Sequence, residues 1–293
     1  MLAALAQAHP GVVGDTFAEA SAVLGYDLWQ LVSAGPAEQL NATERTQPAM
    51  LTAGIATWRV WQHLGGANPS WVAGHSLGEF TALVCAGSLE FAAAVGLVRD
   101  RGQLMQSAVP AGGAAMAAIL GLDDAAVASA CRDAAQGEVV EAVNFNAPGQ
   151  IVIAGTAAAV SRAIAAAKAL GAKRAMPLPV SVPAHSALMR AAAEGLREKL
   201  ARLSLRAPRW TYVSAVDAAA HQDVEDIRAL LVRQLSSPVR WTSTVEALVN
   251  LGATRLIECG PGKVLTALNR RIDRRPELQC LALEDEAAVR AAL

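Results

Sequence analysis

One turn constrains this chain more than any other stretch, the segment Gly74-His75-Ser76-Leu77-Gly78. A short apolar run at 71–73 precedes it, and an apolar helical pattern begins near Glu79. A Gly-x-Ser-x-Gly turn between a strand and a helix is the context of a nucleophile elbow, in which glycines let the backbone bend sharply and expose the serine hydroxyl. This context favours an α/β fold with a reactive Ser76 over the simpler alternative, a glycine-rich strand end capped by serine.

The backbone around the predicted elbow also supplies electrostatic stabilisation. The N–H of Leu77 and the N-terminal dipole of the following helix would face the oxygen that becomes negative when the serine attacks a carbonyl. We therefore predict the Leu77 N–H as a donor of an oxyanion hole.

The composition of the 293 residues excludes several classes of protein. The formal net charge is −1, which gives no bulk attraction for nucleic acid. No apolar run approaches the roughly 20 residues that a membrane span needs, and the N-terminus lacks the basic region of a signal peptide. The four cysteines are widely spaced without a CxxC pair, as in reduced thiols. We expect a soluble, cytoplasmic protein that binds neither membrane nor nucleic acid.

The stretch 112–179 has a rhythm of its own. Strand-like runs at 114–120, 139–145, 150–154 and 174–182 alternate with helical runs at 123–135 and 157–170. The order β-α-β-β-α-β is the split pattern of a ferredoxin-like unit. We therefore predict a ferredoxin-like small domain over 112–179, inserted into a larger α/β domain made of 1–111 and 180–293.

A reactive serine needs a base, and His185 is the best placed of the five histidines. It follows Leu178-Pro179-Val180-Ser181-Val182-Pro183, a rigid extended run that could hold it at a sheet edge. The alternative is a loop histidine at the surface. An acid to orient the base is hard to find: Asp217 is possible, and a backbone carbonyl is the other option.

Arg101 lies late in a helix that we expect to begin near Ser88, a predicted N-cap, and to end near 108. Two interpretations stay open from the chemistry alone. Its neighbours Arg99, Asp100 and Gln103 are polar, which is typical of a solvated helix face. A guanidinium fork can instead bind a substrate carboxylate with two parallel hydrogen bonds.

Five stretches of the chain, in order, carry a resemblance to a known family. They are Gly74-His75-Ser76-Leu77-Gly78-Glu79, Arg101-Gly102-Gln103-Leu104-Met105-Gln106, Val143-Asn144-Phe145-Asn146-Ala147-Pro148-Gly149-Gln150, Pro179-Val180-Ser181-Val182-Pro183-Ala184-His185 and Glu258-Cys259-Gly260-Pro261-Gly262-Lys263-Val264-Leu265. Together they resemble the bacterial malonyl-CoA:acyl carrier protein transacylases, from Met1 to near the C-terminus. The resemblance implies an α/β-hydrolase-like large domain beside the ferredoxin-like one.

The resemblance also implies a role for each matching residue. Ser76 would be the nucleophile, His185 the general base and acid, and Arg101 the group that binds the malonyl carboxylate. The backbone carbonyl of Gln234 would orient the histidine, which would explain the missing acid. Residues that line the pocket would be Gln47, His75 and Asn146.

One part of the family pattern is absent. The family normally begins with a strand and a Gly-Gln-Gly-Ser-Gln turn, whose glutamine supplies the second oxyanion donor, and this sequence starts after that point. Loss of one such donor typically lowers the rate by about 10²–10³. We expect that the start site is misassigned; the alternative is a catalytically impaired form.

The implied reaction is transfer of a malonyl group from malonyl-CoA to the phosphopantetheine thiol of acyl carrier protein in fatty acid biosynthesis, through an acyl-serine. No metal or other cofactor is expected, and we expect a monomer. A serine hydrolase or thioesterase is the rival enzyme, and a non-catalytic binding module is the rival outside enzymes. Because the carrier proteins of this family are acidic, two exposed basic pairs are predicted as their docking site: Lys173 with Arg174, and Arg270 with Arg271.

Overall fold

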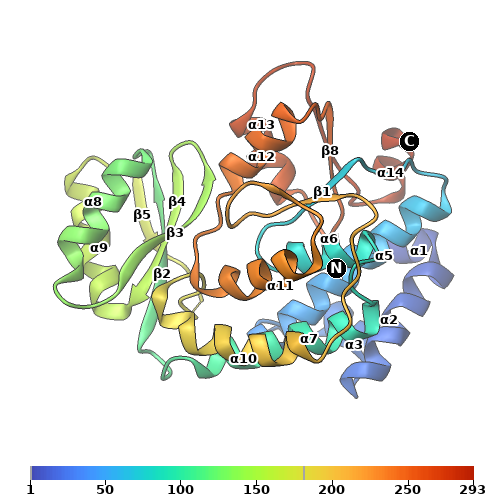
Figure 1. Ribbon diagram of the computed structural model, residues 1–293, viewed down its shortest axis with the longest axis horizontal. Helices are drawn as coiled ribbons and strands as arrows, with labels where there is room; N and C mark the ends of the chain where they lie inside the picture. The colour runs from blue at the N-terminus through green and yellow to red at the C-terminus, as the bar shows by residue number, and fades with distance from the viewer. Residues whose placement is uncertain (1, 181) are drawn as a thin grey trace.

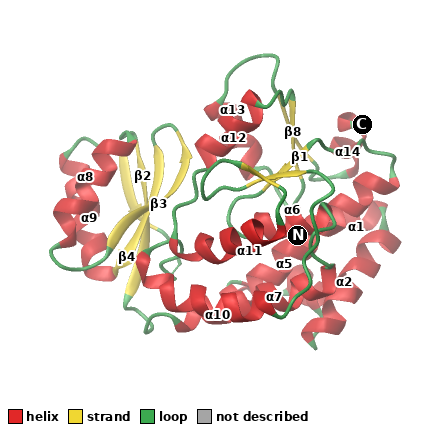
Figure 2. Ribbon diagram, viewed as in Figure 1, coloured by secondary structure: helices red, strands yellow, loops and turns green. Residues whose placement is uncertain are grey.

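The computed structural model describes residues 2–180 and 182–293 (Figure 1). Met1 and Ser181, which fall within two of the sequence stretches above, lie outside the described residues. Figure 2 shows strands gathered into one large sheet on one side and short strands among helices on the other. The predicted α/β fold is confirmed.

The large sheet contains strands β2 (Ala114–Leu120), β3 (Val140–Ala147), β4 (Gln150–Thr156) and β5 (Arg174–Pro177), in the order β3-β4-β2-β5 with every pair antiparallel. Helices α8 (Asp124–Ala135) and α9 (Ala157–Ala169) lie together on one side of it (Figure 1). The predicted β-α-β-β-α-β order is therefore present. Of the predicted extended run 174–182, only the first four residues form a strand.

Alternation along the strands explains why this sheet has two apolar faces. In β4, Ile151 and Ile153 pack with α8 and α9, whereas Val152 and Ala154 pack in a second cluster that includes Leu178 and Ala184. Successive side chains of a strand point to opposite faces, so one strand serves both clusters. The second face therefore lies against the segment that leads to His185.

The rest of the described chain is mainly helical. Its helices are α1 (Ala3–Ala8), α2 (Pro10–Leu24), α3 (Leu28–Ala34), α4 (Ala37–Leu40), α5 (Thr43–His63), α6 (Gly78–Cys85), α7 (Phe91–Ser107), α10 (Arg190–Ala201), α11 (Val224–Arg233), α12 (Trp241–Asn250), α13 (Val264–Ile272) and α14 (Glu286–Ala292), with 3-10 turns η1 (Ala187–Met189) and η2 (Gln234–Ser236). Helix α5 is buried along most of its length. No helix among residues 2–180 and 182–293 is long and apolar enough to cross a membrane.

Helix α7 begins later than the sequence suggested. Its N-cap is Glu90, whose carboxylate accepts the N–H groups of Ala92 and Ala93, and not Ser88. The predicted cap was wrong because a carboxylate two residues further on reaches both free N–H groups and also suits the positive end of the helix dipole.

The short strands form two separate sheets. Strand β1 (Trp71–Ala73) pairs in parallel with β6 (Thr211–Val213), which pairs with β7 (Ala220–His221), and β8 (Arg255–Glu258) pairs in parallel with β9 (Gln279–Ala282). Although β1 and β8 are not hydrogen-bonded, Val72 and Ile257 pack in one apolar cluster and Ala73 and Leu256 in another. Both strands thus contribute to the same two layers.

Hydrogen bonds join the antiparallel sheet to the helical part. The N–H of Phe145 donates to the carbonyl of Val239 at 2.9 Å, and the N–H of Val239 donates to the carbonyl of Val143 at 2.9 Å. Strand β3 is thereby fixed to the loop that follows η2. Gln234, whose side chain donates to the carbonyl of Ser76, begins η2 directly before this loop.

Candidate active site

The elbow has the geometry that the sequence predicted. Ser76 lies between β1 and α6 with a φ of 52°, in the left-handed region that ordinary residues seldom adopt. A Cβ on Gly74 would lie 1.9 Å from the carbonyl carbon of Gly78, whereas a Cβ on Gly78 would meet nothing within 4 Å. Only the first glycine is therefore required by close packing.

His185 holds the serine hydroxyl. Its Nε2 lies 2.8 Å from Ser76 Oγ, and its Nδ1 lies 2.8 Å from the carbonyl oxygen of Gln234. A carbonyl can only accept, so the proton is on Nδ1 and Nε2 is free to accept the serine proton. Of the two groups considered for this position, the structure therefore places a carbonyl at Nδ1, whereas Asp217 contacts His221 at 3.2 Å.

Burial keeps this histidine neutral. The side chain is 3% exposed, and its desolvation, together with the nearby charge of Arg101, lowers the pKa of His185 to about 3. The hydrogen bond to Gln234 acts in the opposite direction. An imidazole that is neutral at pH 7 is in the protonation state that a general base requires.

Arg101 is buried beside Ser76. It is 1% exposed, and its guanidinium donates to Gln47 Oε1 at 2.7 Å, to Gln234 Oε1 at 2.8 Å and to Ser76 Oγ at 3.2 Å. Burial lowers the pKa of Arg101 to about 10, which leaves it positive at pH 7. The solvated-helix interpretation is therefore wrong, and a buried cation lies within reach of any group attached to Ser76.

The predicted pocket residues fall on two sides of Ser76. Gln47, on α5, is 6% exposed and also contacts Met105 of α7. His75 points the other way: its Nε2 lies 2.8 Å from Asn146 Oδ1, and its ring packs against Trp241 with centroids 5.8 Å apart. His75 and Asn146 therefore join the elbow to strand β3.

The N–H of Leu77 donates to no acceptor in the described part of the chain. It stands directly after Ser76 and before the first turn of α6. A free N–H at a helix N-terminus is a suitable donor for an oxyanion at the serine.

Sequence reasoning missed the most buried acid of the site. Glu79 was considered only as the start of a helix, yet its carboxylate is 0% exposed and accepts from Gln234, Ser214 and the N–H of Ala215. Burial raises the pKa of Glu79, and its hydrogen-bond donors oppose that rise. The available signal was a charged residue inside an otherwise apolar eight-residue helix.

The four basic residues predicted for docking are exposed, and one residue of each pair lies close to the turn between β3 and β4, whereas Arg270 donates to the carbonyl of Cys280. The stem of Lys173 lies over Gly121, whose N–H donates to the carbonyl of Gly149 at 2.9 Å. On the other side of this turn, Arg271 donates to the carbonyl of Pro148 at 3.3 Å. The structure thus brings Lys173 and Arg271, which are almost 100 residues apart in sequence, to one turn.

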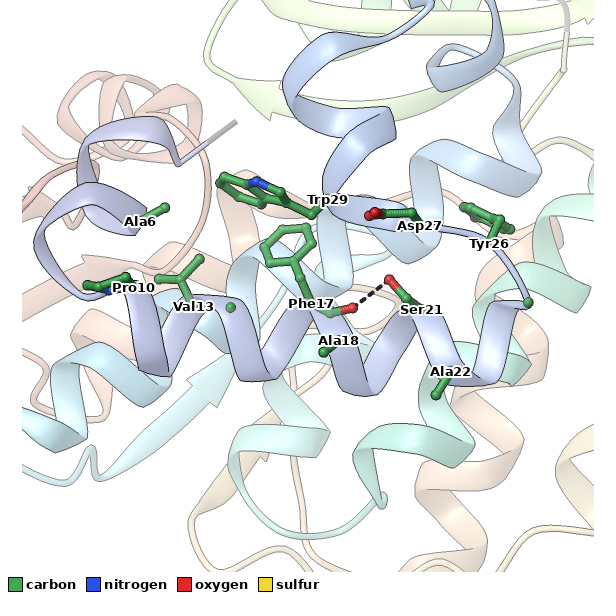
Figure 3. A pocket seen from close by; sticks show the side chains of 12 residues that line it. Ala6, Pro10, Val13, Phe17, Ala18, Ser21, Ala22, Tyr26, Asp27 and Trp29 are labelled. Atoms are coloured by element: carbon green, nitrogen blue, oxygen red, sulfur yellow. Dashed lines mark hydrogen bonds between the residues drawn. The ribbon is translucent and has the colours of Figure 1, made fainter.

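One cavity lies away from these residues. It runs along α2 and has a volume of about 760 Å³; beside it Phe17 and Trp29 pack edge to face with ring centroids 5.0 Å apart. Figure 3 shows the side chains that line it. None of its lining residues contacts Ser76 or His185. Within residues 2–180 and 182–293, no group of three or more His, Cys, Asp and Glu side chains has the arrangement of a metal site.

Known proteins share this chain's sequence along its whole length. The family model of the acyl transferase domain matches residues 15–278. The malonyl CoA-acyl carrier protein transacylase of Escherichia coli K12 is 56% identical over 293 residues, which are 100% of this chain and 94% of that protein. The enzyme of the same name from Bacillus subtilis is 44% identical over 278 residues, 94% of this chain and 87% of that protein.

Solved structures agree in fold. An acyl carrier protein S-malonyltransferase from Vibrio cholerae superposes with a TM-score of 0.96 at 57% identity, covering 100% of this chain and 95% of that one. A malonyl-transacylase solved in complex with a type II PKS acyl-carrier protein gives 0.97 at 55% identity, with coverages of 100% and 94%. This chain therefore belongs to the acyl transferase domain family and, within it, to the malonyl CoA-acyl carrier protein transacylases.

Proposed function

We propose that this enzyme transfers a malonyl group from malonyl-CoA to the phosphopantetheine thiol of acyl carrier protein, through a malonyl ester of Ser76. The observation that carries the proposal is a buried guanidinium within 3.2 Å of the nucleophilic oxygen. A hydrolase of simple esters has no use for a buried cation there, whereas an acyl group that ends in a carboxylate does. The family relationship supports the same function.

In the first half-reaction, His185 Nε2 takes the Ser76 proton as Oγ attacks the thioester carbonyl. The C–O bond forms, negative charge collects on the carbonyl oxygen near the Leu77 N–H, and the C–S bond then breaks. His185 returns the proton to the coenzyme A thiolate. In the second half-reaction, the thiol of the carrier protein attacks the ester, with His185 again acting as base and then acid.

Arg101 would bind the malonyl carboxylate through its fork of N–H groups. Gln47 and Gln234 accept from this guanidinium and so fix its orientation in the pocket. Because the acyl group is anchored at its far end, the ester carbonyl is held in one orientation toward the incoming thiol. The second donor of the oxyanion hole, which the resemblance assigns to the glutamine of a Gly-Gln-Gly-Ser-Gln turn, stays a prediction.

The four basic residues Lys173, Arg174, Arg270 and Arg271, here called the basic patch, are proposed as the docking site of the acidic carrier protein. The position of Lys173 and Arg271 supports this role: they lie on two sides of the turn at Pro148-Gly149, two residues after Asn146, which contacts His75 of the elbow. A carrier protein bound there would have its phosphopantetheine arm next to the elbow. Complementary charge speeds the encounter of the two proteins.

Three further parts of the proposal concern the domain boundaries, the cellular location and the need for a cofactor. We propose domain boundaries at 112 and 179, with an α/β-hydrolase-like domain from 1–111 and 180–293, because α8, α9 and the antiparallel sheet share an apolar cluster of their own. We propose a cytoplasmic location, since the four cysteines are free. We propose that the reaction uses no cofactor besides its thioester substrate, because its steps need only a nucleophile, a base and hydrogen-bond donors.

The test is mass spectrometry of the intact protein after incubation with malonyl-CoA. The wild-type protein should gain one malonyl group, which disappears when acyl carrier protein bearing phosphopantetheine is added. Ser76→Ala should gain none, and Ser107→Ala, a change at an exposed serine of α7, should behave as wild type. A stable adduct on Ser76→Ala, or rapid loss of the adduct in water alone, would contradict the proposal.

A further inference from the structure

The buried carboxylate of Glu79 is not used by any step above. It lies in the first turn of α6, three residues after Ser76, and is 0% exposed. Its Oε1 accepts the N–H of Ala215 at 2.6 Å and the hydroxyl of Ser214 at 3.1 Å, and its Oε2 accepts the side-chain amide of Gln234. Three donors converge on it, as expected for an ionised carboxylate, which only accepts.

The amide of Gln234 lies between this anion and a buried cation. Its Oε1 accepts from Arg101 at 2.8 Å, and its Nε2 donates to Glu79 and, at 2.9 Å, to the carbonyl of Ser76. The two buried charges are therefore connected through one side-chain amide. The carbonyl of the same residue holds His185 Nδ1 at 2.8 Å.

This arrangement allows only one orientation of the amide. If the Gln234 amide turned over, its oxygen would face the Glu79 carboxylate and its NH₂ would face the Arg101 guanidinium. Both contacts would become repulsive. The repulsion would be strong because these groups are buried away from water. Glu79 therefore fixes a residue that touches both the base and the carboxylate-binding arginine.

We propose that Glu79 is a positioning residue for acyl transfer, acting through Gln234 on His185 and Arg101. The proposal rests on the function proposed above. It adds that acyl transfer needs the buried carboxylate of Glu79, which is hydrogen-bonded to Gln234. When Ser76 attacks, His185 becomes positive close to the positive Arg101, and Glu79 is a negative charge that is connected to both through Gln234. The residue touches neither substrate nor Ser76 Oγ.

The experiment compares Glu79→Gln, Gln234→Glu and the double variant that carries both changes. In Glu79→Gln an amide NH₂ meets the Gln234 NH₂, and in Gln234→Glu two carboxylates face each other. The double variant restores one carboxylate and one amide: Glu at 234 accepts from Arg101, and Gln at 79 donates to it while still accepting from Ala215. Only the donor to the Ser76 carbonyl stays lost.

Each single variant should lower kcat for transfer by about 10²-fold, because a small misplacement of catalytic groups has effects of that size. The double variant should recover to within roughly tenfold of wild type, since neighbouring changes are strongly coupled. The KM for malonyl-CoA should change less than kcat. Substitution of a residue that only supports the fold would lower the melting temperature without a selective loss of kcat.

Glu90→Gln is the matched control. It makes the same chemical change at the N-cap of α7, the helix that carries Arg101, without touching Gln234. It should lower the melting temperature and leave kcat unchanged. The inference is overturned if Glu79→Gln keeps wild-type kcat, or if the double variant folds and is no faster than the single ones. The proposed function fails separately, if the wild-type protein gains no malonyl group.

Discussion

Two arginines show how differently this enzyme uses the same side chain. Arg101 is 1% exposed and donates to Gln47, Gln234 and Ser76. Arg271 is exposed at the end of α13 and contacts the turn between β3 and β4 through Pro148 and Gln150. Arg101 is held by side chains from three distant segments, whereas Arg271 lies at the surface.

Burial decides what each charge can do. Away from water a charge-assisted hydrogen bond is strong and hardly screened by salt, so Arg101 is suited to choosing the acyl group. At the surface the same charge contributes little to affinity and is screened within about 8–10 Å, so Arg271 is suited to attracting a charged partner. In the proposed function, the buried arginine would select the acyl group and the exposed arginine would help to select the protein partner.

Loss of the base should have the largest effect of the variants compared here. His185→Ala should slow acylation by malonyl-CoA and transfer to the carrier protein alike, by about 10²–10⁴-fold, since one residue serves both steps as base and acid. Rapid-quench measurement of each half-reaction checks this. The loss should be the same at low and high salt, because the histidine is buried. A loss confined to one half-reaction would assign the base of the other to a different group.

Arg101→Ala should change which acyl group is transferred. A hydrogen bond to a charged group contributes about 1.5–3 kcal/mol, so kcat/KM for malonyl-CoA should fall by roughly 10- to 100-fold. Acetyl-CoA has no carboxylate, and its slow transfer should be kept or improved. Competition between the two thioesters, read by mass spectrometry of the acyl-enzyme, measures the ratio. Equal losses for both would mean that Arg101 only supports the fold.

The pH dependence of the acylation rate should show how well the site excludes water from His185. Because the pKa of His185 is lowered from 6.5 to about 3, the base stays neutral as the pH falls through 6.5. The acylation rate should therefore stay level between about pH 5 and 8, the range in which an ordinary histidine titrates. An acid limb centred near 6.5 would show that water reaches the imidazole before the substrate does.

The same shift also affects stability. Between the folded pKa of about 3 and the unfolded value of 6.5, the unfolded chain binds the extra proton. Stability contributed by the neutral histidine is therefore complete above 6.5 and is lost as the pH falls below it, at up to about 1.4 kcal/mol per pH unit. His185→Ala should remove this part of the slope in denaturant titrations at several pH values.

Local patterns in the sequence predicted local structure well. Strand β2 has the predicted bounds 114–120, and α8 (Asp124–Ala135) lies within the predicted helical run 123–135, because both depend on neighbouring residues only. The elbow was predictable for the same reason. The resemblance supplied Gln234 and Gln47, which no local pattern marks.

The connections between distant segments were not predictable. Gln234 contacts Arg101 across 133 positions and Glu79 across 155, and no spacing rule relates such residues. Polarity was also misleading: the polar neighbours of Arg101 favoured a solvated arginine, yet the tertiary fold buries it completely. Burial of a charge depends on which segments pack around it, and that is a property of the whole fold.

The smallest expected effects belong to the basic patch. Arg174→Glu and Arg271→Glu should each raise the KM for acyl carrier protein by roughly two- to fivefold at low salt, the size expected for exposed charge pairs. Salt should reduce the difference from wild type, since the charges lie in water. Malonyl loading from coenzyme A should stay unchanged.

Arg290→Glu is the control: α14 lies on the far side of the molecule from α8 and α9 (Figure 1), and Arg290 is an exposed arginine paired with Glu286. If Arg290→Glu weakens carrier-protein binding as much as the other two, the overall charge of the enzyme attracts the carrier and the patch has no special part. If loading falls together with transfer, Arg174 and Arg271 bind coenzyme A instead. The exposed arginines would then act on the thioester substrate, as the buried Arg101 does, and not on the protein partner.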